Sequence, residues 1–426
     1  MHAHLVFIKT KQYIYMYNPV EIKKDLFYVG VNDRTTELFE NLWPLPQGVS
    51  YNSYLIRDEK VALIDTVEIG FTDVFLKKIE ILLGDKPIDY LIINHMEPDH
   101  TGALLFLLNK YPNIKLVGSA RIADMLEGFY VVAENVVIVK EGEELSLGKH
   151  TLQFSMTPMV HWPETMMTYV KECKTLFAGD AFGTFGTLDG GVLDSQLNLD
   201  KYWDEMIRYY SNIVGKYGSP VQKALDKFAD KEISTICSTH GPVWTVKENI
   251  VKVIGLYDRL SRYEGEKGLV IAYGSMYGNT EQVAEAIAAE AAAAGVKNIV
   301  MHNLSKSNLS YVIQDVFKYK GLIIGSPTYN AKLFPKVQNL IDELSNKNLK
   351  NRYFGYFGGF TWAGTAVRAL GKFADSMPFE IVCNPVEMKQ SMNEDVYEMA
   401  KTLGKNMAEK VLSDDAIVPN QTTDCE

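Results

Sequence analysis

The stretch DYLIINHMEPDHTG, residues 89–102, places four potential metal ligands directly behind an apolar strand. They are two histidines, His95 and His100, and two carboxylates, Glu97 and Asp99. A loop that gathers two imidazoles and two carboxylates must solvate them, neutralise them or use them to coordinate a cation. A single histidine there would more often be an ordinary surface residue. Four candidate ligands within six positions instead favour a metal site.

Three further candidates occupy the same kind of place, at or just beyond the carboxyl end of a predicted strand. His161 follows HTLQFSMTPMV, Asp180 ends KTLFAGD, and His240 follows EISTICS. Strand ends on one edge converge, so we expect these side chains to meet the first four. His150 and His302 lack that setting, and we interpret them as ordinary surface histidines.

The chain up to about residue 255 mixes strand-like and helix-like segments. Amphipathic runs at 73–84 and 103–111 predict helices between some strands, while other strands follow one another directly. Sheets flanked by helices are therefore expected, which is compatible with an αββα sandwich. The strand candidates are DLFYVGV, YNSYLIR, KVALID, DYLIIN, HTLQFSM, ETMMTYV, KTLFAGD and EISTICS.

The charged stretch DRLSRYEGEKG, residues 258–268, precedes an abrupt restart with the apolar strand GLVIAY. Five strand-helix repeats follow, with strands GLVIAY, NIVMHNL, GLIIGS, RYFGYFGG and FEIVCN, which is the rhythm of a doubly wound parallel sheet. We expect an α/β protein whose first domain spans residues 1–262, with the first twenty or so residues as an extension. The second domain would span 268–413, followed by a polar tail over 414–426.

A glycine-rich turn follows the strand GLVIAY. Ser275, Asn279 and Thr280 supply hydroxyl and amide groups at the start of the next helix. Helix N-termini favour anions, and the loop lacks the GKS/T of a triphosphate site, so a monophosphate is expected. Two later loops, GSPTYNAKLFP at 325–335 and FGGFTWAGTA at 357–366, offer aromatic rings and backbone donors that could hold a flat polar ring.

Composition limits the partners. A chain of 426 residues is comfortable for two domains, and a formal charge of −10 argues against nucleic acid as a partner. The four cysteines form no CxxC pair, which fits a reducing cytoplasm, and Cys237 is interpreted as a core residue. Residues 1–19 contain neither a signal-peptide core nor a membrane-spanning run, so no membrane is expected. His2 and His4 are interpreted as part of a frayed tail.

The first domain resembles the metallo-β-lactamase superfamily, whose hydrolases carry HxHxDH followed by distant His, Asp and His. Glu97 replaces the middle histidine here, and the resulting oxygen-rich set suits iron better than zinc. The pattern HxExDH in this setting resembles the flavodiiron proteins, or A-type flavoproteins, over both domains. That resemblance implies one iron held by His95, Glu97 and His161, a second held by Asp99, His100 and His240, and Asp180 as the bridge.

The second domain resembles flavodoxin of the short-chain kind, which implies bound FMN. The resemblance places the phosphate at Ser275, Met276, Tyr277, Gly278, Asn279 and Thr280. It places the isoalloxazine at Pro327, Thr328, Tyr329, Asn330, Gly358, Gly359, Phe360, Thr361, Trp362, Ala363 and Gly364. Either Trp362 or Tyr329 could stack on the ring, and both alternatives stay open.

Together the resemblances imply an oxidoreductase. A diferrous pair delivers two electrons and reduced FMN two more, which suits reduction of O2 to water, of NO to N2O, or both. The chain carries no CxxC…CxxC rubredoxin motif, so we expect an external donor such as a rubredoxin, a flavin reductase or a reduced deazaflavin. The resemblance also implies a head-to-tail homodimer or a dimer of dimers, with one subunit's flavin beside the other's irons.

Two other interpretations stay open. One is a zinc-dependent hydrolase or thioesterase with an accessory flavodoxin domain, and Glu97 counts against it. The other is a flavin electron carrier whose metal domain serves only to dimerise, which would leave seven ligands idle. Preference between O2 and NO stays open as well.

Overall fold

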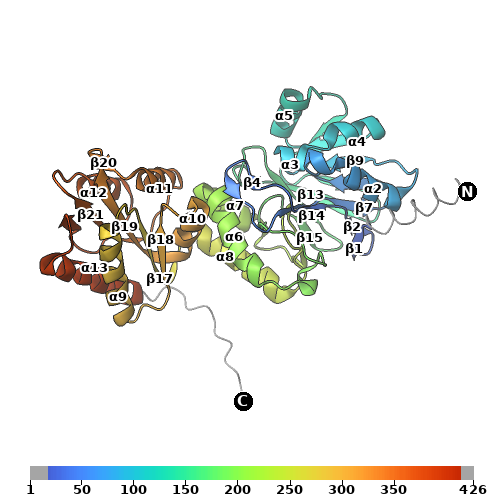
Figure 1. The fold of residues 1–426 in the computed structure, drawn as a ribbon. Helices are drawn as coiled ribbons and strands as arrows, with labels where there is room; N and C mark the ends of the chain where they lie inside the picture. The colour runs from blue at the N-terminus through green and yellow to red at the C-terminus, as the bar shows by residue number, and fades with distance from the viewer. Residues whose placement is uncertain (1–17, 414–426) are drawn as a thin grey trace, which may run out of the picture. The chain divides into compact units, whose positions relative to one another are not determined.

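The computed structural model describes residues 18–413, so the expectations for His2, His4 and the tail lie outside the described residues. The chain forms two compact units (Figure 1). The division falls between Asp258 and Arg259, and residues 211–218 belong with the C-terminal unit. In that unit, the Asn212 amide donates a hydrogen bond to the carbonyl of Ser310. Within residues 18–413, no helix has both the length and the apolar composition needed to cross a lipid bilayer.

The N-terminal unit is a sandwich of two sheets with helices on its outer faces (Figure 1). The first sheet has the order β1-β2-β7-β8-β9-β10-β11 and becomes parallel from β8 onward. Its strands are β1 (Val20–Lys23), β2 (Leu26–Tyr28), β7 (Tyr54–Arg57), β8 (Val61–Ile64), β9 (Tyr90–Ile92), β10 (Lys115–Gly118) and β11 (Val136–Ile138). The associated helices are α2 (Thr72–Leu83), α3 (Pro98–Thr101), α4 (Leu104–Lys110) and α5 (Ala120–Tyr130).

The predicted amphipathic helices are confirmed as α2 and α4. On α2 the residues Phe75, Ile79 and Leu83 repeat at helical spacing and are buried, while the opposite face carries charged side chains. The local pattern therefore sets both the helix and the face that it buries.

The second sheet has the order β12-β13-β14-β15-β16. Its strands are β12 (Glu144–Ser146), β13 (Thr151–Met156), β14 (Met166–Val170), β15 (Thr175–Phe177) and β16 (Thr235–Cys237). Strands β15 and β16 are parallel, so the chain between them must cross over, and helices α6 (Asp200–Tyr209) and α7 (Gly218–Phe228) form that crossover. Helix α8 (Lys247–Ser261) follows β16, and the pairs β3 (Val31–Asp33) with β6 (Val49–Tyr51) and β4 (Leu38–Phe39) with β5 (Trp43–Pro44) complete the unit.

Each of the eight strand candidates in this unit contains an observed strand. In the two large sheets, the sequence missed β1, β10, β11 and β12, and it also missed the short strands β4, β5 and β6. Three of these, β1, β11 and β12, lie at sheet edges, and their residues are mostly half-exposed or exposed. A short edge strand has one unpaired side and little apolar alternation, so its sequence carries a weak pattern.

The C-terminal unit contains a parallel sheet of order β18-β17-β19-β21-β22, which is the doubly wound order 2-1-3-4-5 typical of flavodoxin-like folds. Its strands are β17 (Glu266–Tyr273), β18 (Ile299–Asn303), β19 (Tyr319–Tyr329), β20 (Lys332–Leu333), β21 (Tyr353–Phe360), β22 (Glu380–Ile381) and β23 (Val386–Lys389). Its helices are α9 (Asn279–Ala293), α10 (Leu309–Lys318), α11 (Pro335–Asn346), α12 (Ala366–Ser376) and α13 (Glu394–Ser413).

The fifth predicted strand, FEIVCN, is only partly right. Just two of its residues form β22, and the longer pairing with β21 comes from β23, which lies beyond it. Pro385 separates the two segments, and a proline cannot donate a backbone hydrogen bond to a neighbouring strand.

Candidate functional site

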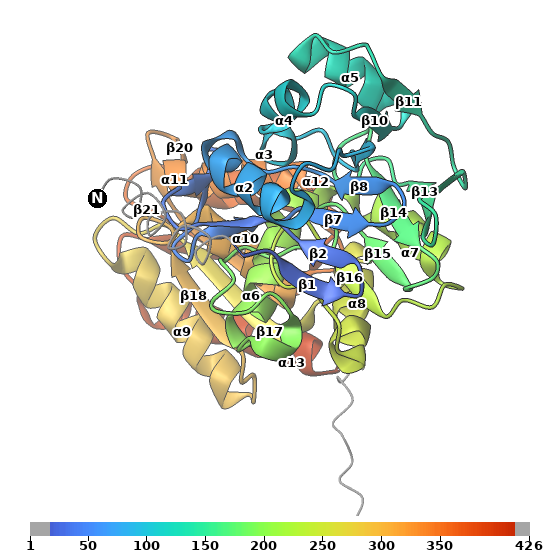
Figure 2. The same ribbon diagram turned by 90° about the vertical axis from the view of Figure 1, so that its right-hand side faces the viewer.

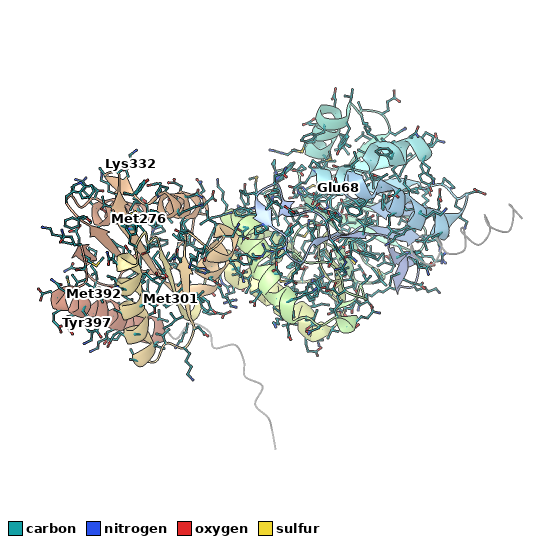
Figure 3. The ribbon with its side chains drawn as sticks, in the orientation of Figure 1. Glu68, Met276, Met301, Lys332, Met392 and Tyr397 are labelled. Atoms are coloured by element: carbon teal, nitrogen blue, oxygen red, sulfur yellow. The ribbon has the colours of Figure 1, made fainter. Side chains whose placement is uncertain are left out.

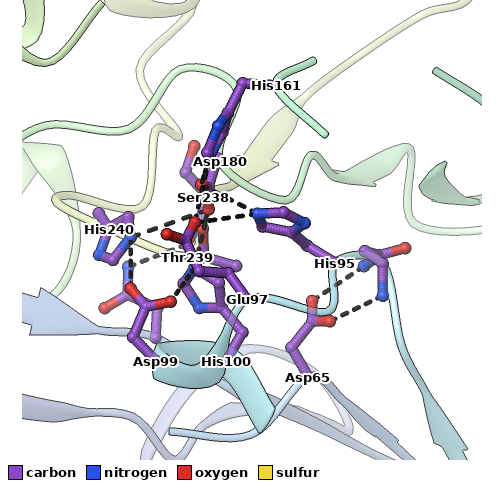
Figure 4. A network of polar contacts seen from close by, with 12 residues as sticks. Asp65, His95, Glu97, Asp99, His100, His161, Asp180, Ser238, Thr239 and His240 are labelled. Atoms are coloured by element: carbon purple, nitrogen blue, oxygen red, sulfur yellow. Dashed lines mark hydrogen bonds and ion pairs between the residues drawn. The ribbon is translucent and has the colours of Figure 1, made fainter. Parts of the chain in front are cut away.

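The segment from the end of β9 through the short helix α3 supplies four of the candidate ligands. Pro98 occupies the first turn of α3, where a residue without an N–H costs no hydrogen bond. Two ligands precede this helix and two lie on it, so the tight turn brings them into one cluster (Figure 4). The loop ligands are His95, Glu97, Asp99 and His100.

The other three ligands leave the second sheet. His161 lies between β13 and β14, Asp180 follows β15, and His240 follows β16. All three are buried, as are the loop ligands except Asp99, which is partly exposed. The site thus sits where the ends of strands from both sheets meet inside the N-terminal unit (Figure 4).

The seven side chains form two groups, in each of which the candidate ligand atoms lie within 4.8 Å of one another. The groups are His95, Glu97, His161 and Asp180, and Asp99, His100 and His240. Within the first, Glu97 Oε2 lies 3.1 Å from Nε2 of both His95 and His161.

Asp180 faces both groups. Its Oδ2 lies 3.0 Å from His161 Nε2, and its Oδ1 lies 2.9 Å from His100 Nε2. The two oxygens therefore point to different sets of imidazoles, as the two ends of a bridging carboxylate do. Thr239, in the loop after β16, donates a hydrogen bond from its hydroxyl to Oδ1 and fixes the carboxylate.

The carboxylates of the cluster favour positive charge on the histidines beside them. Burial opposes protonation of His100, but the carboxylates of Asp99 and Asp180 outweigh it and raise the pKa of His100 to about 9. Burial likewise opposes protonation of His161, yet hydrogen bonds to Asp180 and Glu97 raise its pKa to about 9. Burial disfavours the charged form of Asp180 as well, and the surrounding imidazoles nevertheless hold its pKa well below its usual range.

Several buried polar atoms of the cluster have no hydrogen-bond partner, among them both carboxylate oxygens of Asp99 and Nε2 of His240. An unpaired buried polar atom costs about 1–3 kcal/mol. Two divalent cations would satisfy these atoms and would more than balance the three carboxylates. The residues present therefore fit a pair of metal ions, and an oxygen-rich donor set suits iron.

Neighbouring acceptors fix the orientation of two imidazoles. His95 Nδ1 lies 2.7 Å from Glu164 Oε1, and His240 Nδ1 lies 2.8 Å from the carbonyl of Ser50. Both partners accept hydrogen bonds, so each Nδ1 carries the proton and each Nε2 presents its lone pair to the cluster. Sequence reasoning missed Glu164 and treated it only as the start of a strand. Its position three residues after His161 was the available signal.

The two other histidines within residues 18–413, His150 and His302, lie apart from the cluster. His302 is only 8% exposed, with Nε2 2.8 Å from Asp315 Oδ2, so its interpretation as a surface histidine is wrong. His302 lies on β18, which was predicted as a strand, but it packs against Asp315 of α10, and that tertiary contact explains the difference. His150 is partly buried and lies 2.8 Å from Asp58. Cys237 is 1% exposed, which confirms its prediction as a core residue.

The C-terminal unit has a pocket of about 470 Å³ where β17, β19 and β21 end. Met276, just after β17, and Lys332 of β20 lie toward this end of the sheet (Figure 3). The lining residues are Ser275, Met276, Tyr277, Asn279, Thr280, Pro327, Thr328, Tyr329, Asn330, Ala331, Gly359, Phe360, Thr361, Trp362, Ala363, Met388 and Gln390.

Most of the predicted flavin contacts line this pocket. Gly278, Gly358 and Gly364 do not, although Gly278 has φ +94° and so permits the turn into α9. Sequence reasoning missed Met388 and Gln390 because they lie on or just after β23, which it did not recognise. Backbone N–H groups of Thr365 and Ala366 donate to the Thr328 hydroxyl, which ties two of the loops together.

Comparison with known proteins identifies a separate family for each of the two units. Residues 49–241 match the ODP family beta lactamase, and residues 271–408 match flavodoxin. The nitric oxide reductase of Moorella thermoacetica is 32% identical over 403 residues, which cover 92% of this chain and 100% of that protein. The anaerobic nitric oxide reductase flavorubredoxin of Shigella dysenteriae is 32% identical over 91% of this chain and 82% of its own length.

Solved structures of similar proteins align with this chain over both units. The rubredoxin oxygen:oxidoreductase of Desulfovibrio gigas aligns with a TM-score of 0.89 and 28% identity, covering 93% of this chain and 99% of that one. The flavodiiron protein of Giardia intestinalis aligns with a TM-score of 0.88 and 27% identity, covering 93% and 97%. The fold and its two sites thus define a β-lactamase-like domain joined to a flavodoxin-like domain. The chain belongs to the flavodiiron protein family.

Replacing Glu164 with glutamine should weaken metal binding by about 10–100-fold, because the charge that orients and polarises His95 is lost. Equilibrium titration of the metal-free protein with Fe²⁺ under anaerobic conditions measures this. Glu248→Gln, at the exposed start of α8, is the matched control and should bind as the wild type does. Equal affinities for the two variants would contradict the role of Glu164.

Metal affinity should rise steeply with pH between 6 and 8. His100 and His161 have pKa values of about 9 in the metal-free cluster, so both are protonated in this range and a cation must displace their protons. Despite its burial, the surrounding carboxylates also hold the pKa of His95 well above its usual range, so at least two protons are displaced. The dissociation constant should therefore change at least about 100-fold per pH unit. Fe²⁺ titration against a competing chelator at several pH values tests this, and a flat profile would contradict it.

Proposed function

We propose that this chain is a flavodiiron oxidoreductase that reduces O2 to water, NO to N2O, or both, with electrons passed through FMN. The observation that carries the proposal is Asp180, whose two oxygens face separate groups of ligands in a chain that also holds a pocket for a flavin. The names of two relatives, a nitric oxide reductase and a rubredoxin oxygen:oxidoreductase, support it.

The ligand assignment follows the two groups of side chains. One iron would be held by His95, Glu97 and His161, the other by Asp99, His100 and His240, and Asp180 would bridge them. When bound, two ferrous ions supply two electrons and reduced FMN two more, which are the four that reduction of O2 to water requires.

The protein's own contribution is to position and shield these ligands. Glu164 and the Ser50 carbonyl set the imidazole orientations of His95 and His240. Phe39 and Tyr209 pack against His240, with ring centroids 5.3 and 5.5 Å away. This aromatic wall excludes water from one side of the cluster, which strengthens the electrostatic interactions within it.

The ligand set of the cluster does not favour a zinc hydrolase. Glu97 occupies a ligand position between His95 and His161, where the hydrolases carry a histidine. A hydrolase also has no use for electrons delivered by a flavin.

FMN would occupy the pocket at the strand ends of the domain over residues 268–413, while the irons would belong to the domain over 1–262. The turn at Ser275 to Thr280, at the start of α9, would hold its phosphate. Trp362 is 89% exposed, whereas Tyr329 is 41% exposed and already packs edge-on against Phe334. Trp362 therefore has more ring surface to bury and is the proposed stacking residue.

We also propose an external electron donor and a dimeric assembly. The name rubredoxin oxygen:oxidoreductase for a similar structure supports an external rubredoxin-type donor. Exposed Trp362 and Tyr277 beside the flavin pocket support a head-to-tail dimer, or a dimer of dimers, that brings FMN near a second subunit's irons. A strictly monomeric active protein would contradict that arrangement.

The cysteines of the described residues are free, which is consistent with a location in the reducing cytoplasm.

The anaerobically reduced wild-type protein, loaded with iron and FMN, should consume O2 or NO, with water or N2O as the product. Asp180→Asn should lower consumption of either gas by about 100-fold or more, because the spacing of the metals is lost, while FMN stays bound and reducible. Gas electrodes and product analysis measure the rates, and flavin absorbance serves as the internal control. Undiminished turnover in Asp180→Asn, or no consumption by the wild type, would refute the proposal.

Trp362→Ala should weaken FMN binding by about tenfold, since a stacked aromatic pair contributes on the order of 1 kcal/mol beyond its buried area. Trp362→Phe keeps a ring and should lose less, and Tyr329→Ala should also lose less. Titration of the flavin-free protein with FMN, followed by flavin fluorescence, measures all three. A larger loss in Tyr329→Ala would assign the stacking to Tyr329 instead.

A further inference from the structure

A second cavity, of about 290 Å³, lies in the N-terminal unit between the second sheet and helices α7 and α8. These helices lie beside strands β14, β15 and β16 (Figure 2). Met167 and Leu176 line the cavity from β14 and β15, while Ala224 and Ile250 line it from α7 and α8. The candidate ligands and the flavin contacts are not among its lining residues.

One end of the cavity adjoins the metal cluster. It is lined by Val160, which directly precedes His161, and by Ala181, which directly follows Asp180. Val160 and Ala181 are 3% and 2% exposed, so this end is deeply buried. Neighbouring Cα atoms are about 3.8 Å apart, so the backbone that carries two ligands also forms part of the cavity wall.

The cavity also reaches the surface. Two of its lining residues are exposed, Val251 of α8 at 63% and Ala229. The cavity therefore runs from a solvent-exposed rim to the two ligand-bearing segments.

The lining is apolar except for Lys231, Lys247 and Tyr257. The Lys231 ammonium donates to Gln153, and Lys247 is exposed at the start of α8. A pocket that recognises an organic substrate needs several placed polar groups to orient it. A dry, apolar cavity instead takes up small apolar solutes such as xenon. The lining thus suits an apolar diatomic gas better than a polar ligand.

We infer that this cavity binds the apolar gas, O2 or NO, and delivers it to the metal cluster past Val160 and Ala181. The inference rests on the proposed function and adds a route and a holding site for its substrate. Dissolved gas concentrates in an apolar cavity, so a filled cavity should raise the KM for gas while leaving kcat at saturating gas unchanged.

Ala224→Phe places a ring into the cavity from α7, and Leu225→Trp, at a half-buried position, is a second variant if the first does not fold. Lys223→Phe is the matched control, since it adds the same ring on the exposed face of the same helix. Iron and FMN contents of all variants are compared with the wild type before assay.

Xenon-pressurised crystals of the holoprotein give a readout that does not depend on activity. The wild type and Lys223→Phe should show xenon in the cavity, and Ala224→Phe should not. With a saturating artificial donor, the KM for gas should rise at least about fivefold in Ala224→Phe and stay unchanged in Lys223→Phe.

Absence of xenon from the wild-type cavity, or an unchanged KM in both filling variants, would overturn the inference. A hydrocarbon chain that occupies the cavity of the purified protein and blocks xenon would also overturn it, in favour of a lipid-like ligand. A wild type that takes up xenon but reduces neither gas refutes the proposed function and the delivery role together, while gas binding by the cavity stands.

Discussion

The N-terminal unit depends on one constraint: seven ionisable side chains are held together in a buried place with too few hydrogen-bond partners. Both oxygens of Asp99 and Nε2 of His240 have none. Buried carboxylates that lack partners destabilise a fold unless a cation or a proton compensates them. In the metal-free cluster protons do so, as the raised pKa values of His100 and His161 indicate. Two divalent ions would replace those protons.

The sandwich provides the rigidity that such a cluster requires. The parallel pairing of β15 with β16 makes Asp180 and His240 emerge at the same end of one sheet, and Thr239 ties them together through Asp180. The loop with His95 comes from β9 of the other sheet. The cluster therefore clamps the two sheets at one edge, and the metal ions would add to the stability of the fold as well as to its chemistry.

In the C-terminal unit, loops at the ends of the strands form the binding pocket, as metal-ligand side chains form the site in the N-terminal unit. Strand order reverses between β17 and β19, and in open α/β sheets the ligand crevice lies at such a switch point. Helices α7 and α8, in the other unit, leave an apolar space against the second sheet, in contact with the segments that hold His161 and Asp180. One unit thus offers a site for a redox ring, and the other offers a metal cluster with an apolar cavity beside it.

The sequence by itself determined the strand-helix order, the α/β class and the candidate ligands, because these rest on local patterns. The patterns are apolar runs, helical spacing, the HxExDH segment and, for His161, Asp180 and His240, a place at the end of a predicted strand. The phosphate turn at Gly278 is local for the same reason. Tertiary structure alone decided that Asp180 faces both ligand groups, that Glu164 holds His95, and that β23 rather than the end of FEIVCN completes the flavin pocket. Those features join residues far apart in the chain, and their distances are set by sheet pairing and packing, which no local pattern encodes.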